Sequence, residues 1–416
     1  MKALVLPSEV CGRVTAPPSK SYTHRALFIG LLTKGKTSIL NPLICEDTIA
    51  SLLAVREFGA KASWNTIESY GMPREPRNII DCKRSATTMR FAIAIASITE
   101  GLTILTGSES LRRRPMGDLL RALEKLGIKI LSRGYKAPIA ILGDIDRLKG
   151  KEIEIEGSTS SQFISALLLV APKVGLTIRV VGDVVSRPYI DITLRTLKLA
   201  GIEIEHENYR TFFIDTQEYK ETTFKILGDY SSASFLLAAG ALYGKVSIRG
   251  LDPQDVQGDR KIIDVLKEMG AKVRIYGKNI EVSSNQLEGV EFDCKDTPDL
   301  FPVISVLGCF AKGTTRITNV KRLKFKETER VNVMIQNLKK MKARVQLSGD
   351  SVLVRKSELK GTLLNTEGDH RIAMALVIAA LGAKGESVIE DVSCIKDSYP
   401  MFFDHLKRLN VNVRVI

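Results

Sequence analysis

Short glycine-led segments that favour β-strands recur six times along the 416-residue chain. Successive copies lie 66 to 74 residues apart, and a second marker such as FGAK or MGAK follows each one. The six segments are GKTSI at residue 35, GLTI at 101, GLTI at 175, GKVSI at 244, GTTRI at 313 and GESVI at 385. Because six copies account for nearly the whole chain, the fold must be built from one repeated unit.

Each copy opens with polar residues and continues with an apolar run long enough for a helix. The runs are SYTHRALFIGLL, TTMRFAIAIASI, SSQFISALLLVA, SSASFLLAAGAL, DLFPVISVLGCF and DHRIAMALVIAA. Apolar residues nearly all round predict buried helices. The glycine-led strand comes next, then an amphipathic helix, as in DLLRALEKLG at 118–127, and then strands around the second marker. The order helix, strand, helix, strand, strand, with three copies per domain, predicts two similar α/β domains.

One motif in the first copy suggests a different function. Residues 30–37, GLLTKGKT, satisfy the phosphate-loop pattern GxxxxGK[ST] of nucleotide triphosphatases. That loop follows a strand and opens a helix, whereas here an apolar helix precedes the motif and the strand TSIL follows it. Since the five sister copies have an ordinary helix-to-strand turn at this point, we interpret the motif as such a turn.

Composition limits the remaining classes of function. The chain is 44% hydrophobic and 26% charged, and its longest apolar run, 373–383, is shorter than the ~18 residues of a membrane span. The N-terminal segment has too few apolar residues for a signal peptide, so we expect a cytoplasmic protein without a membrane partner. Six dispersed cysteines and four histidines indicate neither a disulfide framework nor a metal site. A formal charge of +14 suits nucleic acid or small anionic substrates.

The start of a buried helix has unsatisfied backbone N–H groups and a partial positive charge, which attract anions. The helix starts of this chain carry Lys20, Ser21 and Arg25; Ser85, Thr87 and Arg90; Ser160, Ser161 and Gln162; Asp299; His370 and Arg371. The Ser, Thr and Asp residues could simply be helix caps. Long polar side chains are poor choices at a buried helix start. The functional signal therefore comes from Lys20, Arg25, Gln162 and Arg371.

Further charged residues lie outside these helix starts. LRRRPMGDLL contains three consecutive arginines, 112–114, which could also form a solvated basic loop. In FKETERV, a helix would bring Lys326, Glu327 and Arg330 onto one surface, where they could equally be an exposed ion-pair stripe. Lys396 in DVSCIKDSYP is a further cation.

Six motifs, in order along the chain, carry a family resemblance: APPSKSYTHRAL, SLRRRPMGDLL, SSQFISALLL, SRPYIDITL, KFKETERV and EGDHRIAMAL. The chain resembles the 5-enolpyruvylshikimate-3-phosphate synthase family over its whole length. The resemblance implies an inside-out α/β barrel fold, with two domains of three copies each and an active site in the cleft between them. Because the expected ligands are split between the two domains, we also expect the domains to close around the substrates. It also implies that residues 1–14 join 227–416 in one domain, while 15–226 form the other.

The implied reaction transfers the enolpyruvyl group of phosphoenolpyruvate to the 5-hydroxyl of shikimate 3-phosphate and releases phosphate, without metal or cofactor. Both substrates are polyanions, so the positive charge needs no nucleic acid partner. The residues implied to hold shikimate 3-phosphate are Lys20, Ser21, Arg25, Ser160, Ser161, Gln162, Ser186, Asp299 and Lys326. Those implied to hold phosphoenolpyruvate are Lys20, Arg114, Gln162, Arg330, Arg371 and Lys396. We expect a monomeric enzyme of aromatic amino-acid biosynthesis.

Such a reaction needs acid and base groups on opposite sides of the reacting carbon, in a site that excludes water. The methylene carbon of phosphoenolpyruvate is protonated, the 5-hydroxyl loses its proton as it attacks, and phosphate leaves the tetrahedral intermediate. We expect Asp299 to handle the hydroxyl proton. Glu327 and Lys20 are expected to act on the carbon and phosphate side, and His370 is expected to assist or orient.

Two alternatives belong to other families. A sister enzyme family transfers the same group to UDP-N-acetylglucosamine, but it has a Lys-Asn pair where Lys20 and Ser21 stand and a reactive Cys in the loop that matches 108–117. The loop SESLRRRPMG has no Cys. A basic nucleic-acid-binding repeat protein would interleave its cations with aromatic residues, which make up only 6% of this chain.

The chain departs from the family pattern at two places. Arg322 stands where the family often has Asn, so the contact of that Asn with shikimate 3-phosphate is in question. In DCKRSATTMR, Lys83, Arg84 and Ala86 replace the first Gly, the Asn and the second Gly of the usual Gly-Asn-Ser-Gly-Thr run. A methyl group at Ala86 should narrow the phosphoenolpyruvate pocket. We therefore expect phosphoenolpyruvate to fit and glyphosate, a bulkier competitor in this family, to bind poorly.

Overall fold

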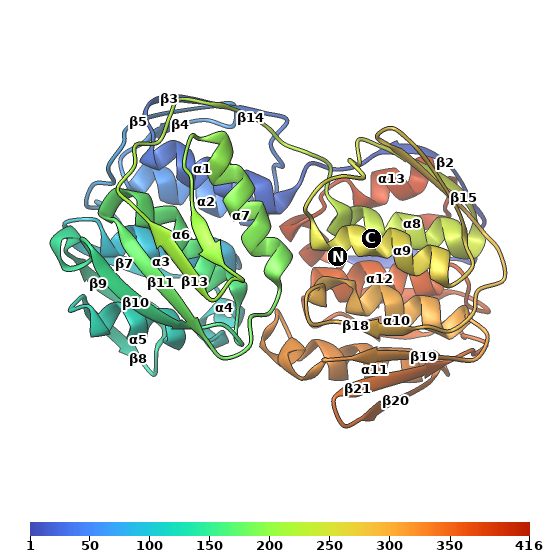
Figure 1. Cartoon of the computed structure of the whole chain (residues 1–416). Helices are drawn as coiled ribbons and strands as arrows, with labels where there is room; N and C mark the ends of the chain where they lie inside the picture. The colour runs from blue at the N-terminus through green and yellow to red at the C-terminus, as the bar shows by residue number, and fades with distance from the viewer. The chain divides into compact units, whose positions relative to one another are not determined.

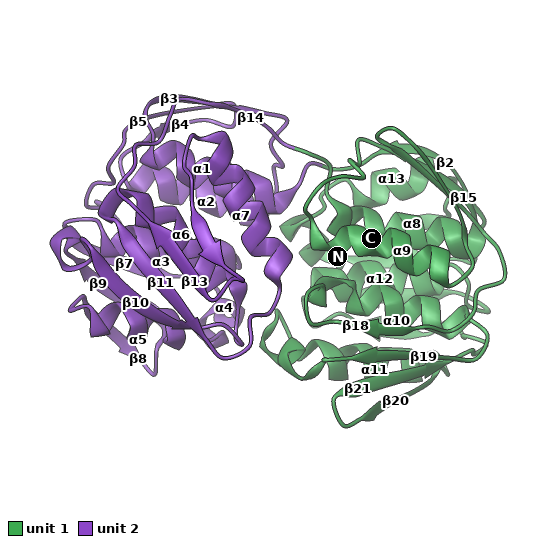
Figure 2. Ribbon diagram, viewed as in Figure 1, with its two compact units in different colours: residues 1–17, 227–416 green, residues 18–226 purple.

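The computed structural model describes residues 1–416, which divide into two compact units (Figures 1 and 2). Unit 1 comprises Met1–Pro17 and Leu227–Ile416, and unit 2 comprises Pro18–Ile226. The family resemblance implied a first change of unit after residue 14. Strand β2 (Val10–Thr15) pairs within unit 1 along its whole length, so the change falls after Pro17 instead.

Six four-stranded sheets repeat one pattern of pairing. In the second repeat, β6 (Ile80–Asp81) runs parallel to β7 (Gly101–Thr106), and β9 (Lys136–Gly143) lies antiparallel between β7 and β8 (Lys129–Arg133). Each sheet therefore has one strand more than the repeat expected from the sequence, because a short strand also precedes each buried helix. β6 has only two residues, too few for an alternating pattern to be recognised in the sequence.

Three sheets take a strand from a distant part of the chain. In unit 2, β14 (Thr223–Lys225) lies parallel to β3 (Lys34–Leu40) and so joins the sheet of the first repeat. In unit 1, β2 lies parallel to β15 (Gly244–Arg249). The N-terminal strand β1 (Lys2–Val5) lies antiparallel between β23 (Ser387–Glu390) and β24 (Val413–Val415) and completes the sheet of the last repeat.

The other strands complete the six sheets. They are β4 (Lys61–Ala62), β5 (Thr66–Tyr70), β10 (Lys151–Glu156), β11 (Leu176–Val181), β12 (Glu205–Glu207), β13 (Thr211–Ile214), β16 (Lys272–Tyr276), β17 (Asn279–Ser283), β18 (Glu291–Asp293), β19 (Thr314–Thr318), β20 (Arg344–Ser348), β21 (Ser351–Arg355), β22 (Leu363–Asn365), β23 (Ser387–Glu390) and β24 (Val413–Val415).

The six apolar runs form the buried helices that the sequence predicted. They are α1 (Lys20–Leu32), α3 (Ala86–Ser97) and α6 (Ser161–Val174) in unit 2, and α8 (Tyr230–Tyr243), α10 (Phe301–Phe310) and α12 (His370–Ala380) in unit 1. Every residue of α12 is buried. In unit 1, α8, α10 and α12 contact one another and form the centre of the hydrophobic core (Figure 1).

The remaining helices each present one buried face. They are α2 (Glu46–Glu57), α4 (Glu109–Arg113), α5 (Gly117–Lys125), α7 (Arg187–Leu199), α9 (Ile262–Glu268), α11 (Arg330–Lys340) and α13 (Phe402–Arg408), with short 3-10 helices at Ile145–Arg147, η2 (Gly258–Lys261), η3 (Pro298–Leu300), η4 (Lys321–Phe325) and η5 (Val392–Asp397). Along α5, Leu119, Leu120 and Leu123 are buried and Lys125 is exposed, as the apolar spacing predicted.

The phosphate-loop pattern at 30–37 lies at a helix-to-strand turn. Helix α1 ends at Leu32 and β3 begins at Lys34, which is the reverse of the strand-to-helix order that a nucleotide site requires. No helix of the structure is both long and apolar enough to cross a membrane.

Candidate active site

The three buried helices of unit 2 all begin with an uncharged serine cap. Ser19 accepts a hydrogen bond from the Tyr22 N–H at 3.5 Å, and Ser85 accepts one from Thr88 at 3.2 Å. Ser160 accepts one from the Gln162 N–H at 3.3 Å. A serine cap satisfies one N–H group without cancelling the positive charge of the helix start. These three helix starts therefore keep their affinity for anions.

Lys20, the first residue of α1, forms an ion pair within unit 2. Its Nζ lies 2.6 Å from Asp47 Oδ2, and both side chains are largely buried. Ser21 follows at the same helix start and is half-buried. Asp47 stands in the first turn of α2, outside the buried-helix starts, so the sequence pattern gave no reason to select it.

The start of α6 forms a second polar group with a side chain from α3. Arg90 Nη1 donates to Ser160 Oγ at 3.2 Å and to Gln162 Oε1 at 2.6 Å, and its guanidinium lies 4.9 Å from the centre of the Phe163 ring. Ser161, between the two acceptors, is buried. Arg90 thus connects two of the helix starts that the sequence selected.

Arg25 is a buried side chain of unit 2, not a surface residue. Its guanidinium donates to Thr193 Oγ1 at 2.8 Å and to the Tyr189 carbonyl at 2.8 Å, both on α7, and to Ser165 Oγ on α6 at 3.4 Å. Burial lowers its pKa to about 10, a value at which the side chain is still a cation at neutral pH. Arg25 therefore joins α1 to α6 and α7 while it places a positive charge behind the helix starts.

Two further predicted ligands of unit 2 are buried at helix ends. Ser186 precedes α7 with a left-handed backbone (φ 54°), and Arg114 ends α4. The loop before α3 contacts this region, since the Ser108 N–H donates to the Lys83 carbonyl at 2.7 Å. Lys83 itself has φ 52° and pairs with Asp81 at 2.9 Å. Ala86, the first residue of α3, is buried.

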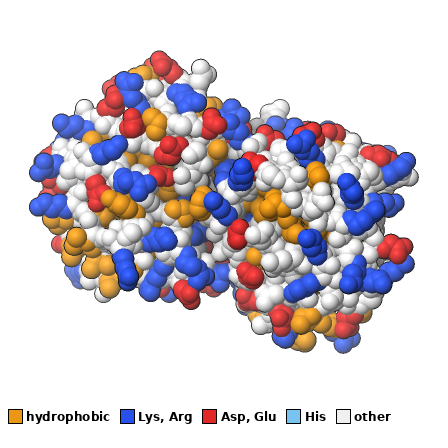
Figure 3. Space-filling view, turned by 90° about the horizontal axis from the view of Figure 1, so that it is seen from below, with side chains coloured by type: hydrophobic (Ala, Val, Ile, Leu, Met, Phe, Trp, Pro, Cys, Tyr) orange, Lys and Arg blue, Asp and Glu red, His pale blue; other side chains and the backbone are white.

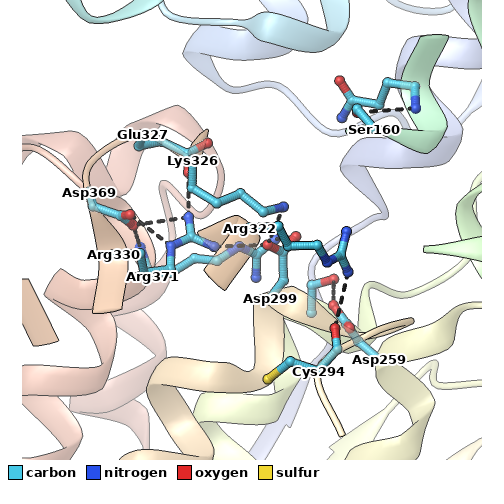
Figure 4. A network of polar contacts seen from close by, with 12 residues as sticks. Ser160, Asp259, Cys294, Asp299, Arg322, Lys326, Glu327, Arg330, Asp369 and Arg371 are labelled. Atoms are coloured by element: carbon cyan, nitrogen blue, oxygen red, sulfur yellow. Dashed lines mark hydrogen bonds and ion pairs between the residues drawn. The ribbon is translucent and has the colours of Figure 1, made fainter. Parts of the chain in front are cut away.

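Unit 1 gathers three carboxylates and three cations in one network, which we call the charge cluster (Figure 4). Its members are Asp299, Lys326, Glu327, Arg330, Asp369 and Arg371. Because the formal charges cancel, the cluster can lie inside the unit without an excess of either sign.

Arg330 is the centre of the charge cluster and is fully buried. Its Nη1 lies 2.9 Å from Asp299 Oδ1, its Nε lies 2.8 Å from Asp369 Oδ2, and its Nη2 also donates to Glu327. Asp369 additionally caps α12 by accepting from the Arg371 N–H at 2.9 Å. The guanidinium fork thus fixes three carboxylates from three different segments.

Asp299 has cations on both of its oxygens. Lys326 Nζ lies 3.1 Å from Oδ1, which also accepts from Arg330, and Arg371 Nη2 lies 3.0 Å from Oδ2. Burial opposes ionisation of Asp299, but the charges of Arg371, Lys326 and Arg330 prevail and hold its pKa well below its usual value. In this arrangement Asp299 is a carboxylate with little tendency to accept a proton.

Lys326 has the opposite shift. Although 26% of its side chain remains exposed, desolvation lowers its pKa to about 8 against the attraction of Asp299. For Arg330, burial favours the neutral form, but Asp369, Glu327 and Asp299 outweigh it and raise the pKa above its usual value. Arg330 is therefore a permanent cation, whereas Lys326 can lose its charge in mildly alkaline solution.

The motif FKETERV is not a helix, contrary to the sequence expectation. Helix α11 begins at Arg330, and residues 326–329 form the irregular segment that connects η4 to it. Lys326, Glu327 and Arg330 still meet, because Asp299 and Asp369 supply the counter-charges that a helix surface would not. Helical spacing thus led to the right neighbours through the wrong local structure.

Three other residues selected from the sequence also lie in unit 1. His370 is the buried first residue of α12, and Lys396 is exposed in η5. Arg322 donates through Nη2 to the Cys294 carbonyl at 3.0 Å and also to that of Lys295. It therefore anchors the segment that leads to Asp299.

Asp369 was not among the selected residues, although it stands within the motif EGDHRIAMAL. An aspartate immediately before a buried helix is a strong cap signal. Its second role, as the partner of the buried Arg330, depends on a contact between residues 39 positions apart. Such a contact has no signature in a single sequence.

On the face seen in Figure 3, Lys and Arg side chains are scattered among Asp and Glu side chains over both units. A nucleic-acid-binding face would instead have a continuous basic stripe. The charged groups that indicate a function are those at the helix starts and in the charge cluster.

Fold and charge together define an α/β protein equipped for small polyanionic molecules. A sequence model described as EPSP synthase (3-phosphoshikimate 1-carboxyvinyltransferase) matches residues 5–406. The 3-phosphoshikimate 1-carboxyvinyltransferase of Thermococcus kodakarensis is 42% identical over 402 residues, which cover 96% of this chain and 98% of that protein. That of Pyrococcus furiosus is 41% identical, with 98% and 100% covered. This chain belongs to the EPSP synthase family.

Solved structures agree with this assignment. An EPSP synthase from Acinetobacter baumannii superposes with a TM-score of 0.82 at 25% identity, and the match covers 100% of both chains. A second structure of the enzyme from that organism gives a TM-score of 0.80 at 24% identity. The two-domain α/β fold expected from the repeats is confirmed.

Proposed function

We propose that this transferase moves the enolpyruvyl group of phosphoenolpyruvate to the 5-hydroxyl of shikimate 3-phosphate and releases phosphate, a step of aromatic amino-acid biosynthesis. One observation carries the assignment of its site. Unit 2 offers neutral-capped helix starts with cations, whereas unit 1 offers cations that are each balanced by a carboxylate. Unit 2 is thus suited to hold anions, and unit 1 to move protons beside them.

Shikimate 3-phosphate binds mainly to unit 2 in this proposal. The proposed ligands there are Lys20, Ser21, Arg25, Ser160, Ser161, Gln162 and Ser186, with Asp299 and Lys326 from unit 1. The start of α6 supports a phosphate subsite because Ser160 and Ser161 lie at a positive helix start beside Arg90. Arg25 adds charge from behind, since its hydrogen bonds to α6 and α7 hold it in place.

Phosphoenolpyruvate takes its ligands from both units. Lys20, Arg114 and Gln162 are the proposed contacts in unit 2, and Arg330, Arg371 and Lys396 are those in unit 1. Arg330 and Arg371 favour carboxylate or phosphate binding through their fork geometry. Because the ligands come from two units, we keep domain closure as a prediction; it assembles the site and excludes water.

Substrate anions change the state of the charge cluster. Without substrate, Asp299 and Glu327 form ion pairs with Arg330. When a phosphate or carboxylate binds to Lys326 and Arg371, those cations are shared with the substrate and attract Asp299 less. The pKa of Asp299 then rises toward its usual value. Asp299 becomes a better base at the moment when the 5-hydroxyl is present.

The proton balance assigns the remaining roles. Asp299 takes the proton of the 5-hydroxyl as its oxygen attacks C2 of phosphoenolpyruvate, and Glu327 with Lys20 delivers a proton to the methylene carbon. When the phosphate leaves the tetrahedral intermediate, the new methyl group returns one proton. His370, at the start of α12, assists or orients these groups.

The activity is tested by phosphate release that requires both substrates. Purified protein should release phosphate with phosphoenolpyruvate and shikimate 3-phosphate together, and not with either alone. Replacing the acceptor by UDP-N-acetylglucosamine should give no release. Release with the nucleotide sugar only, or with neither acceptor, would reject the proposal.

We further propose that a single chain is the active form and that it works in the cytoplasm. Light scattering on active fractions from size-exclusion chromatography tests the first of these. A mass of at least twice the 45.9 kDa of one chain in every active fraction would contradict the proposal of a monomer.

A further inference from the structure

Three buried polar side chains join the first two turns of α1, α2 and α3 in unit 2. They are His24 on α1, Ser51 on α2 and Thr88 on α3, and none is more than 1% exposed. His24 Nδ1 lies 2.8 Å from Ser51 Oγ, which in turn lies 2.7 Å from Thr88 Oγ1. We call these three residues the His24 network. The proposed reaction gives none of them a role.

Thr88 connects the His24 network to the helix starts. Its Oγ1 donates to Ser85 Oγ at 2.8 Å and to the Asp47 carbonyl at 3.3 Å. Ser85 is the cap of α3, and the carboxylate of Asp47 lies 2.6 Å from Lys20 Nζ. The network therefore ends at the residue that holds Lys20 and at the cap of a second helix.

The hydrogen bonds of the network can run in one direction only. A hydroxyl has a single hydrogen, and the Asp47 carbonyl can only accept, so Thr88 donates toward Asp47 and Ser85 and must accept from Ser51. Ser51 has then used its hydrogen and must accept from His24. This order assigns the Nδ1–H tautomer to His24. Its Nε2 is buried and has no hydrogen-bond partner in the protein.

His24 must be neutral for this order to hold, because one ring nitrogen carries no hydrogen. Burial, and then the positive charges of Lys20 and Arg25 on the same helix, keep the pKa of His24 well below its usual value. The imidazole is therefore uncharged at neutral pH. It adds no third cation to the start of α1.

A sister repeat shows that a buried helix does not need a polar group at this place. Ser19 caps α1 and Asp369 caps α12, and each accepts from the N–H three residues later. Five residues after the cap, α1 has His24, whereas α12 has Met374, which is 1% exposed. A buried imidazole with an unpaired nitrogen is more costly than methionine. A role beyond packing would account for that cost.

We propose that His24 is a positioning residue: its Nδ1–H starts a series of hydrogen bonds through Ser51 and Thr88 that fixes Asp47, whose carboxylate holds Lys20 for substrate. The inference rests on the proposed function of Lys20. His24 itself touches no substrate. It fixes the first turns of α2 against α1 and α3, so that the Lys20 ammonium is already in place when an anion binds.

Thr88→Val tests the centre of the network, since valine keeps the shape of threonine and removes the hydroxyl. The Kd of shikimate 3-phosphate, measured by calorimetry, should rise about tenfold. Thr103→Val is the matched control: it removes another buried hydroxyl of unit 2, one that has no hydrogen-bond partner, and should leave the Kd unchanged. Thr88→Ser restores the hydroxyl and should bind as wild type does.

His24→Leu and His24→Asn test the first donor. Leucine has no N–H and should raise the Kd about tenfold, whereas the side-chain NH₂ of asparagine replaces Nδ1–H and should restore binding. Because the network acts through Asp47, His24→Leu should have little further effect in an Asp47→Asn background. A merely structural His24 would raise the Kd by the same factor in both backgrounds.

The tautomer is measured separately, by nitrogen-15 NMR of the imidazole groups at pH 7. The chain has four histidines, and the signals lost in His24→Asn identify those of His24. We expect a neutral ring with hydrogen on Nδ1. A ring with hydrogen on Nε2, or on both nitrogens, overturns the inference.

The complete experiment combines this spectrum with calorimetry on wild type and the folded variants, as judged by circular dichroism. A wild-type Kd in Thr88→Val, or no recovery in either Thr88→Ser or His24→Asn, also overturns the inference. If wild type neither binds shikimate 3-phosphate nor releases phosphate, the proposed function fails instead. The NMR spectrum requires no substrate, so the two failures are distinguishable.

Discussion

Arg330 Nη1 lies 2.9 Å from Asp299 Oδ1 in a place where the arginine side chain is fully buried. The same guanidinium is fixed by Asp369, which caps the buried helix α12. A residue proposed to bind substrate is thus also part of the core of unit 1. Its substitution should affect stability as well as activity, and the two effects can be measured separately.

Replacement of Arg330 by Met should destabilise the protein by about 3–5 kcal/mol, because Asp299, Glu327 and Asp369 would be left without their shared counter-charge. Urea unfolding followed by circular dichroism measures the change. Arg355→Met, on the exposed side of β21, serves as the control and should change the free energy of unfolding by less than about 0.5 kcal/mol. Equal midpoints for the two variants would contradict the prediction.

Asp299→Ala should lower kcat by about a hundredfold or more, since the 5-hydroxyl then loses its proton acceptor. Binding of shikimate 3-phosphate, measured by calorimetry, should persist. The exposed Asp293, six residues earlier, provides Asp293→Ala as the comparison. A decrease in kcat of only a few-fold for Asp299→Ala would remove Asp299 from its proposed role.

Deprotonation of Lys326 should raise the KM for shikimate 3-phosphate at alkaline pH. Its pKa of about 8 means that the ammonium charge is present below pH 8 and is lost above it, so the KM for shikimate 3-phosphate should rise above pH 8. Lys326→Arg stays charged throughout and should abolish that rise. The neighbouring exposed Lys324→Arg should leave it unchanged. If the KM for shikimate 3-phosphate still rises above pH 8 in Lys326→Arg, the rise belongs to another group.

Ala86→Gly should make the enzyme more sensitive to glyphosate. Removal of one methyl group from the start of α3 widens the proposed phosphoenolpyruvate pocket, and one carbon in a tight pocket is worth about tenfold or more in affinity. The inhibition constant of glyphosate should fall accordingly, while the KM for phosphoenolpyruvate changes little. An unaltered inhibition constant would show that this methyl group does not limit the pocket.

Lys83 and Arg84, the two cations before α3, should differ in their effect on the binding of phosphoenolpyruvate. Lys83 pairs with Asp81, whereas Arg84 directly precedes the cap Ser85. Arg84→Asn should raise the KM for phosphoenolpyruvate by about threefold to tenfold, and the increase should diminish in high salt. Lys83→Asn, which tolerates the left-handed backbone at this position, should have little effect. Equal effects of both substitutions would indicate a general surface potential instead.

Periodicity predicted the six buried helices because an all-apolar run such as 372–380 has one stable location, the interior. It could not predict that β14 pairs with β3 or that β1 completes the last sheet, since pairing over such separations leaves no local pattern. The family resemblance supplied the grouping of the N-terminal strand with the second half.

The candidate site was predicted unevenly for a similar physical reason. Residue type and helix starts selected Lys20, Gln162 and Arg371, whose side chains are unusual where they stand. Asp47 and Asp369 were not predicted because an aspartate near a helix start is ordinary, and only their contacts distinguish them. Protonation also lay beyond sequence reasoning, since it depends on the balance of burial against three or four neighbouring charges.

The placement of β1 sets an order of folding during synthesis. Unit 2 is one continuous stretch, Pro18–Ile226, and can pair all its strands while the second half of the chain is still being made. In the last sheet of unit 1, by contrast, the Lys2 N–H donates to the Ile416 carbonyl at 2.7 Å, and the Ile416 N–H donates back to Lys2 at 2.9 Å. Strand β1 therefore leaves the ribosome before unit 2 and finds its partners only after the second half of the chain has been made. A chain stalled near its end would carry β1 as an open strand edge available to other chains.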